Sequence, residues 1–298
     1  MSSAFKAHLA LFSVSLIYGG NYTIAKVVLD QEHIQPLAFI LLRVMAGVLL
    51  FWSFHALVVR ERMRRKDLGR IALCSVFGVA INQMFFFSGL KWTTPINASL
   101  IMTTTPILVL VISAILIGER ITQRKVLGIL LGAAGAILLI AYGEQISFGG
   151  KRLLGDLLIF VNASAFGIYL VLVKGLMDRY HPVTVVTWIF SFGLFLVLPF
   201  GIQDFTQIKW HTFDWQIWLA VAYVVIGTTF LAYLLNAYAL KLVNASLVSV
   251  YIYLQPLFAS LIALLSGKDS LNSIKVTAAC LIFAGVYLVS IQRRRVSA

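Results

Sequence analysis

Long apolar stretches alternate with short polar ones along almost the whole chain. Runs of about 20 apolar residues recur, which is the length that a helix needs to cross a bilayer. Ten such stretches are predicted to be transmembrane helices: 9–29, 36–59, 71–91, 94–118, 124–142, 153–175, 182–202, 216–240, 243–266 and 272–291. The pattern therefore predicts an all-α polytopic membrane protein.

The order of residues in the first half returns in the second half. Residues 77–135 align with residues 227–285 at a constant offset, so that Pro106 matches Pro256. The match is weak at single positions but consistent in order, and it runs almost from end to end. The chain is therefore predicted to consist of two related copies.

The repeat divides the ten helices into five and five. The glycine-containing link between Tyr142 and Arg152 is the boundary, which gives residues 1–142 as the first five-helix repeat and residues 143–298 as the second. A copy with an odd number of crossings places the next copy upside down in the membrane. Many secondary transporters build a site that is reachable from either face in this way.

Composition and charge place the protein in a membrane and orient it. Of the 298 residues 60% are apolar and 12% charged, and a soluble protein cannot cover that much apolar surface. Of the basic residues in loops and near helix ends, 16 fall on the side of the N-terminus and 7 on the other. The positive-inside rule then predicts that both termini are cytoplasmic. The net charge of +13 gives no reason to expect nucleic acid, because the basic loop at 60–70 is short and lies where orientation requires it.

Residues for catalysis or metal binding do not cluster in the sequence. The acidic residues and histidines lie in loops or near helix ends, and there is no HExxH, GxSxG or P-loop pattern. The two cysteines, Cys74 and Cys280, have no redox or metal-binding spacing. We therefore expect no enzyme activity, no metal site and no cofactor.

Several short motifs, in a fixed order and partly duplicated, carry a resemblance to a known family. They are Tyr18-Gly19-Gly20-Asn21 before Lys26, Arg43, Asn97 to Leu100, Thr105-Pro106, Gly118-Glu119-Arg120 and Ser249 to Gln255-Pro256. The second copy departs from the pattern with Lys268-Asp269 in place of Gly-Glu. With ten helices in two halves, the chain resembles the EamA-type transporters of the drug/metabolite transporter superfamily over its whole length. The resemblance implies transport of a small metabolite, often an amino acid or a derivative, commonly outward across the bacterial inner membrane.

Six helices, the first, third, fourth, sixth, eighth and ninth, carry a stripe of amides, phenols or hydroxyls on one face. Such groups should face a wet cavity or a partner and not lipid. The candidate substrate-binding residues are Tyr18, Asn21, Arg43, Gln83, Thr105, Asn162, Tyr169, Tyr233, Tyr251 and Gln255. For any one of them the alternative is a hydrogen bond between helices. Phenols and amides without a carboxylate in mid-membrane suit a neutral or zwitterionic metabolite with some apolar surface.

Arg43 and the paired prolines each allow two interpretations. Arg43, well inside the second helix, is either an anchor for a substrate carboxylate or a brace to neighbouring groups, and the resemblance favours the brace. Pro106 and Pro256 interrupt the helices that contain them, and they are either hinges of an opening motion or static kinks.

Small residues and missing carboxylates give two last expectations. Gly128 and Gly132 form a GxxxG pair that favours packing within the chain, hence a monomer, with a homodimer as the alternative. Because no carboxylate or histidine lies in mid-membrane, the sequence favours a facilitator or exchanger over proton-driven transport. The rival class is a membrane receptor or assembly partner that transports nothing.

Overall fold

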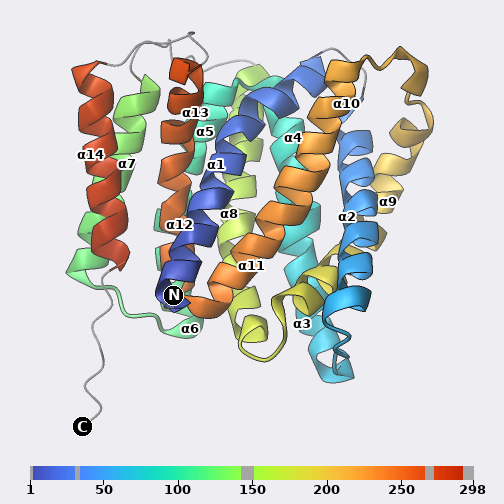
Figure 1. Ribbon diagram of the computed structural model, residues 1–298, viewed down its shortest axis with the longest axis horizontal. Coiled ribbons are helices and arrows are strands. Elements are labelled where there is room, and N and C mark those ends of the chain that lie inside the picture. Colours follow the sequence, from blue (N-terminus) through green and yellow to red (C-terminus); the bar gives the residue numbers. More distant parts are fainter. Residues whose placement is uncertain (1–2, 31–33, 142–150, 266–271, 291–298) are drawn as a thin grey trace.

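The computed structural model describes residues 3–30, 34–141, 151–265 and 272–290, and within them it contains helices and no strand (Figure 1). The first half comprises α1 (Ser3–Asp30), α2 (Pro36–Val58), η1 (Arg65–Asp67), α3 (Leu68–Ser75), η2 (Val76–Ile81), α4 (Asn82–Trp92), α5 (Pro95–Met102), α6 (Thr105–Ile117) and α7 (Gln123–Ala141). The second half comprises α8 (Lys151–Met177), α9 (Pro182–Thr206), η3 (Trp210–Thr212), α10 (Trp215–Ala222), η4 (Tyr223–Leu231), α11 (Ala232–Leu242), α12 (Ala245–Val250), η5 (Tyr251–Tyr253), α13 (Leu254–Leu265) and α14 (Ser273–Ser290).

Eight helical runs in the described residues are long and apolar enough to cross a membrane. They are Pro36–Val58, Arg65–Trp92, Pro95–Ile117, Arg152–Met177, Pro182–Thr206, Trp215–Leu242, Ala245–Ile262 and Ser273–Ser290. The prediction of a polytopic helical membrane protein is thereby confirmed. The count of ten stays a prediction, because α1 and α7 are not among the eight. The boundary between the halves and the Lys268-Asp269 pair fall largely outside the described residues.

Contacts between helices of the first and second half come in corresponding pairs, in which the two halves exchange places. α1 packs on α11 and α13, and its counterpart α8 packs on α4 and α6, which are the counterparts of those two helices. α7 packs on its own counterpart α14 along one edge of the bundle, and α2 packs on its counterpart α9 at the opposite edge (Figure 1). The start of α1 and the end of α14 lie at the same end of the bundle. This is the pattern that two related halves would produce, and the division into two five-helix repeats stays a prediction.

The edge formed by α7 and α14 depends on glycine. A Cβ atom on Gly285 would lie 2.5 Å from the backbone oxygen of Gly128 and 2.6 Å from the backbone nitrogen of Gly132. On the other side of the contact, a Cβ on Gly135 would lie 2.7 Å from the oxygen of Ala278. Small residues let the two backbones touch. The GxxxG pair thus packs within the chain, which was the favoured interpretation.

Both halves contain a π-helical turn at the same place in the repeat, a feature that the sequence analysis did not predict. η2 leads into α4, and η4 leads into α11. A π-turn widens the helix, and such turns are frequent at functional sites. Two backbone carbonyls of these turns, on Gly78 and Val224, accept side-chain hydrogen bonds in the site described below.

The helices that contain the paired prolines are interrupted just before them. α5 ends at Met102 and α6 begins at Thr105, next to Pro106, while η5 separates α12 from α13 close to Pro256. The hydroxyls of Thr103 and Thr104 donate to carbonyls three residues earlier, at 2.6 and 2.7 Å. Matched breaks are therefore present in both halves, and their role as hinges stays a prediction.

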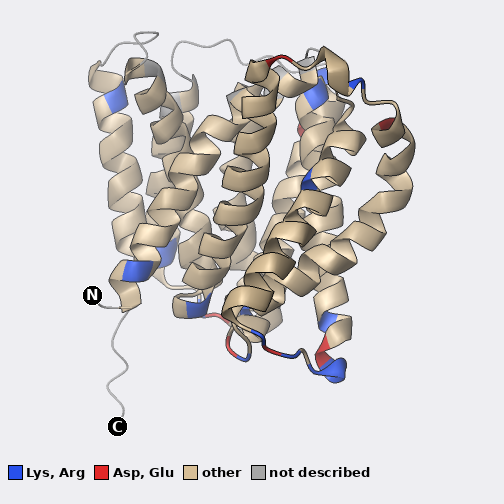
Figure 2. Ribbon diagram, turned by 45° about the vertical axis from the view of Figure 1, so that its right-hand side comes forward, with Lys and Arg blue, Asp and Glu red and all other residues tan. Residues whose placement is uncertain are grey.

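Charged residues gather at the two ends of the bundle (Figure 2). The segment between α2 and α3 is tied to the turn after α8: Tyr180 donates its hydroxyl to Asp67 at 2.6 Å, and Arg179 pairs with the same carboxylate at 3.1 Å. Burial and this hydrogen bond raise the pKa of Tyr180 above its ordinary value. These contacts hold the two loops together at one end of the bundle.

Candidate functional site

A cavity lies in the middle of the bundle, enclosed by elements of both halves. Its volume is about 80 Å³. Its lining comprises Leu11, Val14, Ser15, Tyr18, Asn21, Tyr22, Arg43, Asn82, Gln83, Phe86, Phe87, Met102, Asn162, Phe166, Tyr233, Asn236, Val248, Tyr251, Ile252 and Gln255. The space is narrow and fits a small solute only.

Eight of the ten predicted site residues line this one cavity. They are Tyr18, Asn21, Arg43, Gln83, Asn162, Tyr233, Tyr251 and Gln255. They come from helices of both halves that the sequence predicted to surround a cavity, apart from Arg43, which lies on α2. Whether they bind a substrate stays a prediction.

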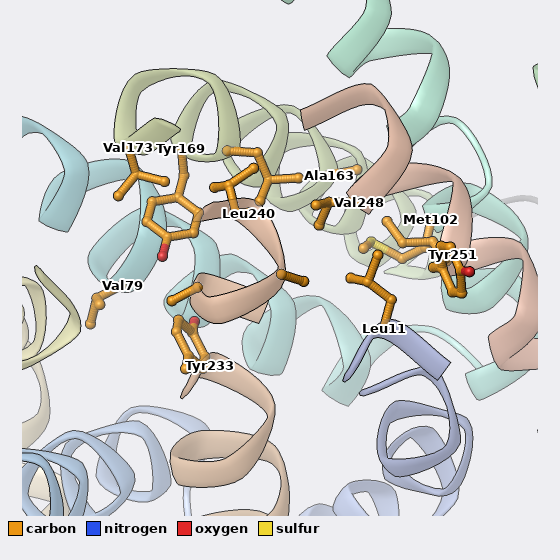
Figure 3. Packing of buried hydrophobic residues seen from close by; sticks show 14 of the residues in the cluster. Leu11, Val79, Met102, Ala163, Tyr169, Val173, Tyr233, Leu240, Val248 and Tyr251 are labelled. Carbon is orange, nitrogen blue, oxygen red and sulfur yellow. The ribbon is translucent and has the colours of Figure 1, made fainter. Parts of the chain in front are cut away.

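The other two predicted residues, Thr105 and Tyr169, lie outside the lining. The predicted face of the fourth helix assumed one unbroken helix, whereas the break before Thr105 changes the face, and Met102 lines the cavity from this run. Tyr169 is buried with its ring against Gly78 of η2. In Figure 3 the hydroxyl ends of Tyr169 and Tyr233 point toward each other, and Tyr251 lies near Leu11 and Met102.

Arg43 is buried beside the cavity and has no carboxylate partner among the described residues. Its Nε donates to the hydroxyl of Thr229 at 2.9 Å and its Nη2 to that of Thr228 at 3.3 Å. Both hydroxyls donate in turn to the backbone carbonyl of Val224, so they can only accept from Arg43. The guanidinium carbon lies 4.5 Å from the ring centre of Phe87, a cation–π contact. The Nη1 group has no hydrogen-bond partner within the described chain.

Tyr233 joins the two halves through a chain of hydrogen bonds. Its hydroxyl donates to the backbone carbonyl of Gly78 at 2.9 Å and accepts from the Nε2 of Gln83 at 3.3 Å. Because the phenol has only one proton, this chain fixes which end of the Gln83 amide carries the NH₂ group. The carbonyl oxygen of Gln83 must therefore point elsewhere.

Three cavity residues keep a buried carbonyl oxygen without a partner in the described part of the structure: Asn21, Gln83 and Asn162. The orientation of Asn162 is also fixed, because its Nδ2 donates at 2.7 Å to the backbone oxygen of Asn82, which can only accept. Leaving such an acceptor unsatisfied costs about 1–3 kcal/mol. Three oxygens near one cavity form a set of acceptors suited to N–H donors of a ligand.

α1 is fastened to the break between α12 and α13. The hydroxyl of Ser15 donates to the backbone oxygen of Tyr251 at 2.8 Å, and the Nδ1 of His8 lies 2.5 Å from the Tyr251 hydroxyl. Further along α1, Tyr22 donates to the Oε1 of Gln255 at 3.1 Å, which leaves the Gln255 NH₂ group as a donor at the cavity. α1 and η5 are therefore joined by two side-chain contacts beside the cavity.

Sequence reasoning missed Phe86, Phe87 and Thr228. The phenylalanines carry no polar signal, and Thr228 matters because η4 is a π-turn, which an apolar pattern does not reveal. Paired hydroxyls at Thr228 and Thr229 inside an apolar run were the one available hint. Among the described residues, no three His, Cys, Asp or Glu side chains come close enough to hold a metal ion.

Replacing Tyr233 with Phe tests the link between the halves. The change leaves the Gly78 carbonyl buried without its donor, so we expect the free energy of unfolding to fall by about 1–3 kcal/mol. Thermal unfolding of the purified protein measures this loss. The control is Tyr238→Phe on the same helix, since Tyr238 has no hydrogen bond in the described structure. Equal effects of the two changes would contradict the role assigned to Tyr233.

Comparisons with known proteins agree with this architecture. The model of the EamA-like transporter family matches residues 5–141 and 153–291. An uncharacterized transporter of Archaeoglobus fulgidus is 27% identical over 97% of this chain and 99% of its own length. An uncharacterized inner membrane transporter of Salmonella typhimurium, YicL, is 24% identical over 99% of this chain and 98% of its own. A solved crystal structure that is 22% identical aligns with a TM-score of 0.72 over 95% of both chains, which bears on the fold alone.

Proposed function

The chain belongs to the EamA-like transporter family, and from that membership we propose that it is a secondary transporter of a small zwitterionic metabolite, an amino acid or a close derivative. The relatives are named as transporters, which supports movement of a small molecule and not catalysis. The inner-membrane relative supports a location in a bacterial inner membrane. Outward transport is proposed from the family resemblance.

The proposed topology has ten transmembrane helices in two inverted five-helix repeats, with both termini in the cytoplasm. The exchangeable packing of the halves, the matched π-turns and the matched breaks support two repeats. Alternating access would then move one half against the other about the central cavity. Pro106 and Pro256 are proposed as hinges, since each stands beside a break. Because the glycine edge is used within the chain, we propose a monomer as the working unit.

The single observation that carries the proposed substrate class is the hydrogen bonding of Arg43. A buried guanidinium that lines the cavity, with no carboxylate of its own chain among the described residues, suits a carboxylate brought by the substrate. The unpartnered oxygens of Asn21, Gln83 and Asn162 suit an ammonium group, which has three N–H donors. Phe86 and the ring of Phe87 leave room for an apolar side chain of modest size.

Counterflow of radiolabelled amino acids in proteoliposomes tests this proposal. We expect saturable exchange, and a loss of at least about tenfold in Gln83→Ala and Gln255→Ala, since each variant loses a hydrogen-bonding group at the cavity. Tyr251→Ala should lose activity as well, because it also frees the contact with α1. Gln203→Ala, on the exposed end of α9, is the matched control.

The outcomes of the counterflow assay separate the rival functions. No flux of any amino acid or other metabolite by a folded protein would favour the receptor or assembly partner. Normal flux in all three variants would keep the transporter and overturn the cavity assignment.

A further inference from the structure

A second hollow, separate from the central cavity, opens where α2 ends beside α9. It offers about 560 Å³ to water and is lined by Trp52, His55, Ala56, Arg60, Glu61, Arg62, Met63 and Trp188. The end of α2 lies at the same end of the bundle as the start of α1 (Figure 1). By the charge distribution this is the cytoplasmic face of the membrane.

The charge in this hollow is positive and accessible. Arg60 donates its Nε to the oxygen of Ala56 at 2.9 Å, which holds the side chain while its two NH₂ groups have no partner in the described residues. Arg62 is exposed and makes no hydrogen bond or ion pair within the described part of the chain. The one carboxylate, of Glu61, accepts the backbone N–H of His181 at 2.8 Å and is thus held by the opposite loop.

The backbone at Arg60 gives a second sign that this side chain is placed for a purpose. Arg60 has φ of 50°, the left-handed conformation, directly after the end of α2. Glycine is the usual residue at this position after a helix, because a side chain there costs about 1–2 kcal/mol. Arginine at this position lowers the stability of the fold compared with glycine. A need for positive charge at this place would explain why arginine is found there.

The walls of the hollow are indole rings that continue into an apolar surface. Trp52 and Trp188 meet edge to face at 5.7 Å, and the Nε1 of Trp52 is fixed by the hydroxyl of Ser191 at 2.9 Å. Along the same two helices, away from the loop, Leu49 and Phe195 are 69% and 75% exposed. Tryptophan favours the interface between headgroups and acyl chains, and the exposed apolar residues suit the chains themselves.

We propose that this hollow binds the phosphate headgroup of an anionic phospholipid from the cytoplasmic leaflet, with its acyl chains along α2 and α9. Guanidinium groups suit a phosphate diester, and basic pockets between transmembrane helices on the cytoplasmic side are recognition sites for anionic headgroups. Free phosphate is the other source of the same chemistry. The apolar surface next to the hollow favours the lipid, because a soluble anion makes no use of it.

Native mass spectrometry of the detergent-purified full chain tests the proposal with dioleoyl phosphatidylglycerol as the probe. Zwitterionic phosphatidylcholine and inorganic phosphate serve as the comparison ligands. The double variant R60Q/R62Q should bind phosphatidylglycerol on the order of 10- to 30-fold more weakly. The matched control is R64Q/R65Q, which removes the same charge from exposed residues of the same loop outside the hollow.

A variant without a charge change completes the test. Ala56→Phe, at an exposed position, should fill the hollow while the protein stays folded. It should weaken the binding of phosphatidylglycerol to a similar extent as R60Q/R62Q does. Equal losses of phosphatidylglycerol binding in the two double variants would overturn the proposed site. They would show that the lipid is attracted to the charge of the whole loop and not to the hollow. Displacement of the lipid by inorganic phosphate at equal concentration would overturn the choice of a lipid. Weaker binding of phosphatidylglycerol in both Ala56→Phe and R60Q/R62Q, with unchanged binding in R64Q/R65Q, supports the proposed lipid site.

Discussion

Arg43→Gln is expected to lower transport on the order of 100-fold while the protein keeps its fold. Truncating one partner of a buried, hydrogen-bonded charge pair typically costs 2–5 kcal/mol, and here the other partner is the substrate carboxylate. The variant removes a buried charge that has no carboxylate partner among the described residues. We therefore expect its free energy of unfolding to change little. Uptake into proteoliposomes and thermal unfolding, measured on the same preparation, check both parts.

This combination separates the two interpretations of Arg43. As a brace between α2 and η4, the residue would hold Thr228 and Thr229 in place, and its loss would lower the unfolding temperature together with activity. As an anchor, it would leave the unfolding temperature within about 3 °C of the parent protein. Arg65→Gln, at an exposed position between α2 and α3 and outside both cavities, is the matched control for the change of charge. A stable Arg43→Gln protein with normal transport would contradict the assignment altogether.

Gly285→Ala is expected to destabilise the protein by about 3 kcal/mol or to prevent its folding. The added Cβ would lie 2.5 Å from the oxygen of Gly128 and 2.6 Å from the nitrogen of Gly132. Both are backbone atoms, so no rotation of a side chain relieves the overlap and α14 must move away from α7. The yield of monodisperse protein and its unfolding temperature measure the effect.

Gly69→Ala provides the control with the same chemical change. A Cβ on Gly69 would meet no atom within 4 Å, and alanine is a better helix former than glycine. We expect this variant to be as stable as the parent protein or slightly more stable. Equal behaviour of the two alanine variants would show that the edge between α7 and α14 is not tightly packed.

The helices could be predicted because a helix that crosses a bilayer needs a run of about 20 apolar residues. The predicted segments 36–59 and 182–202 correspond to α2 (Pro36–Val58) and α9 (Pro182–Thr206), each of which begins at a proline. Proline suits the first turn of a helix, where its missing N–H leaves no bond unmade, so sequence and structure mark the same start. Polar residues on one helix face were predictable for the same reason, and eight of ten line one cavity.

The remaining features depend on contacts between distant residues. The Gly78 carbonyl of η2 accepts a hydrogen bond from Tyr233, which lies in the other half of the chain. No local sequence pattern predicts a hydrogen bond between residues so far apart. Thr105 lies outside the cavity lining, and Pro106 alone does not show that the helix is broken between Met102 and Thr105. Arg43 was identified as unusual from its position, but its threonine partners depend on the tertiary packing of α2 on η4.

The most direct test of the account compares one amino acid with its carboxamide in two proteins. The amino acid is the one that competes best in the counterflow assay, and its carboxamide differs by lacking the carboxylate charge. We expect the parent protein to prefer the amino acid by at least about tenfold, as the loss of one charged hydrogen bond implies, and Arg43→Gln to show no preference. An equal preference in both proteins would contradict it, because Arg43 would then not hold the carboxylate in the cavity.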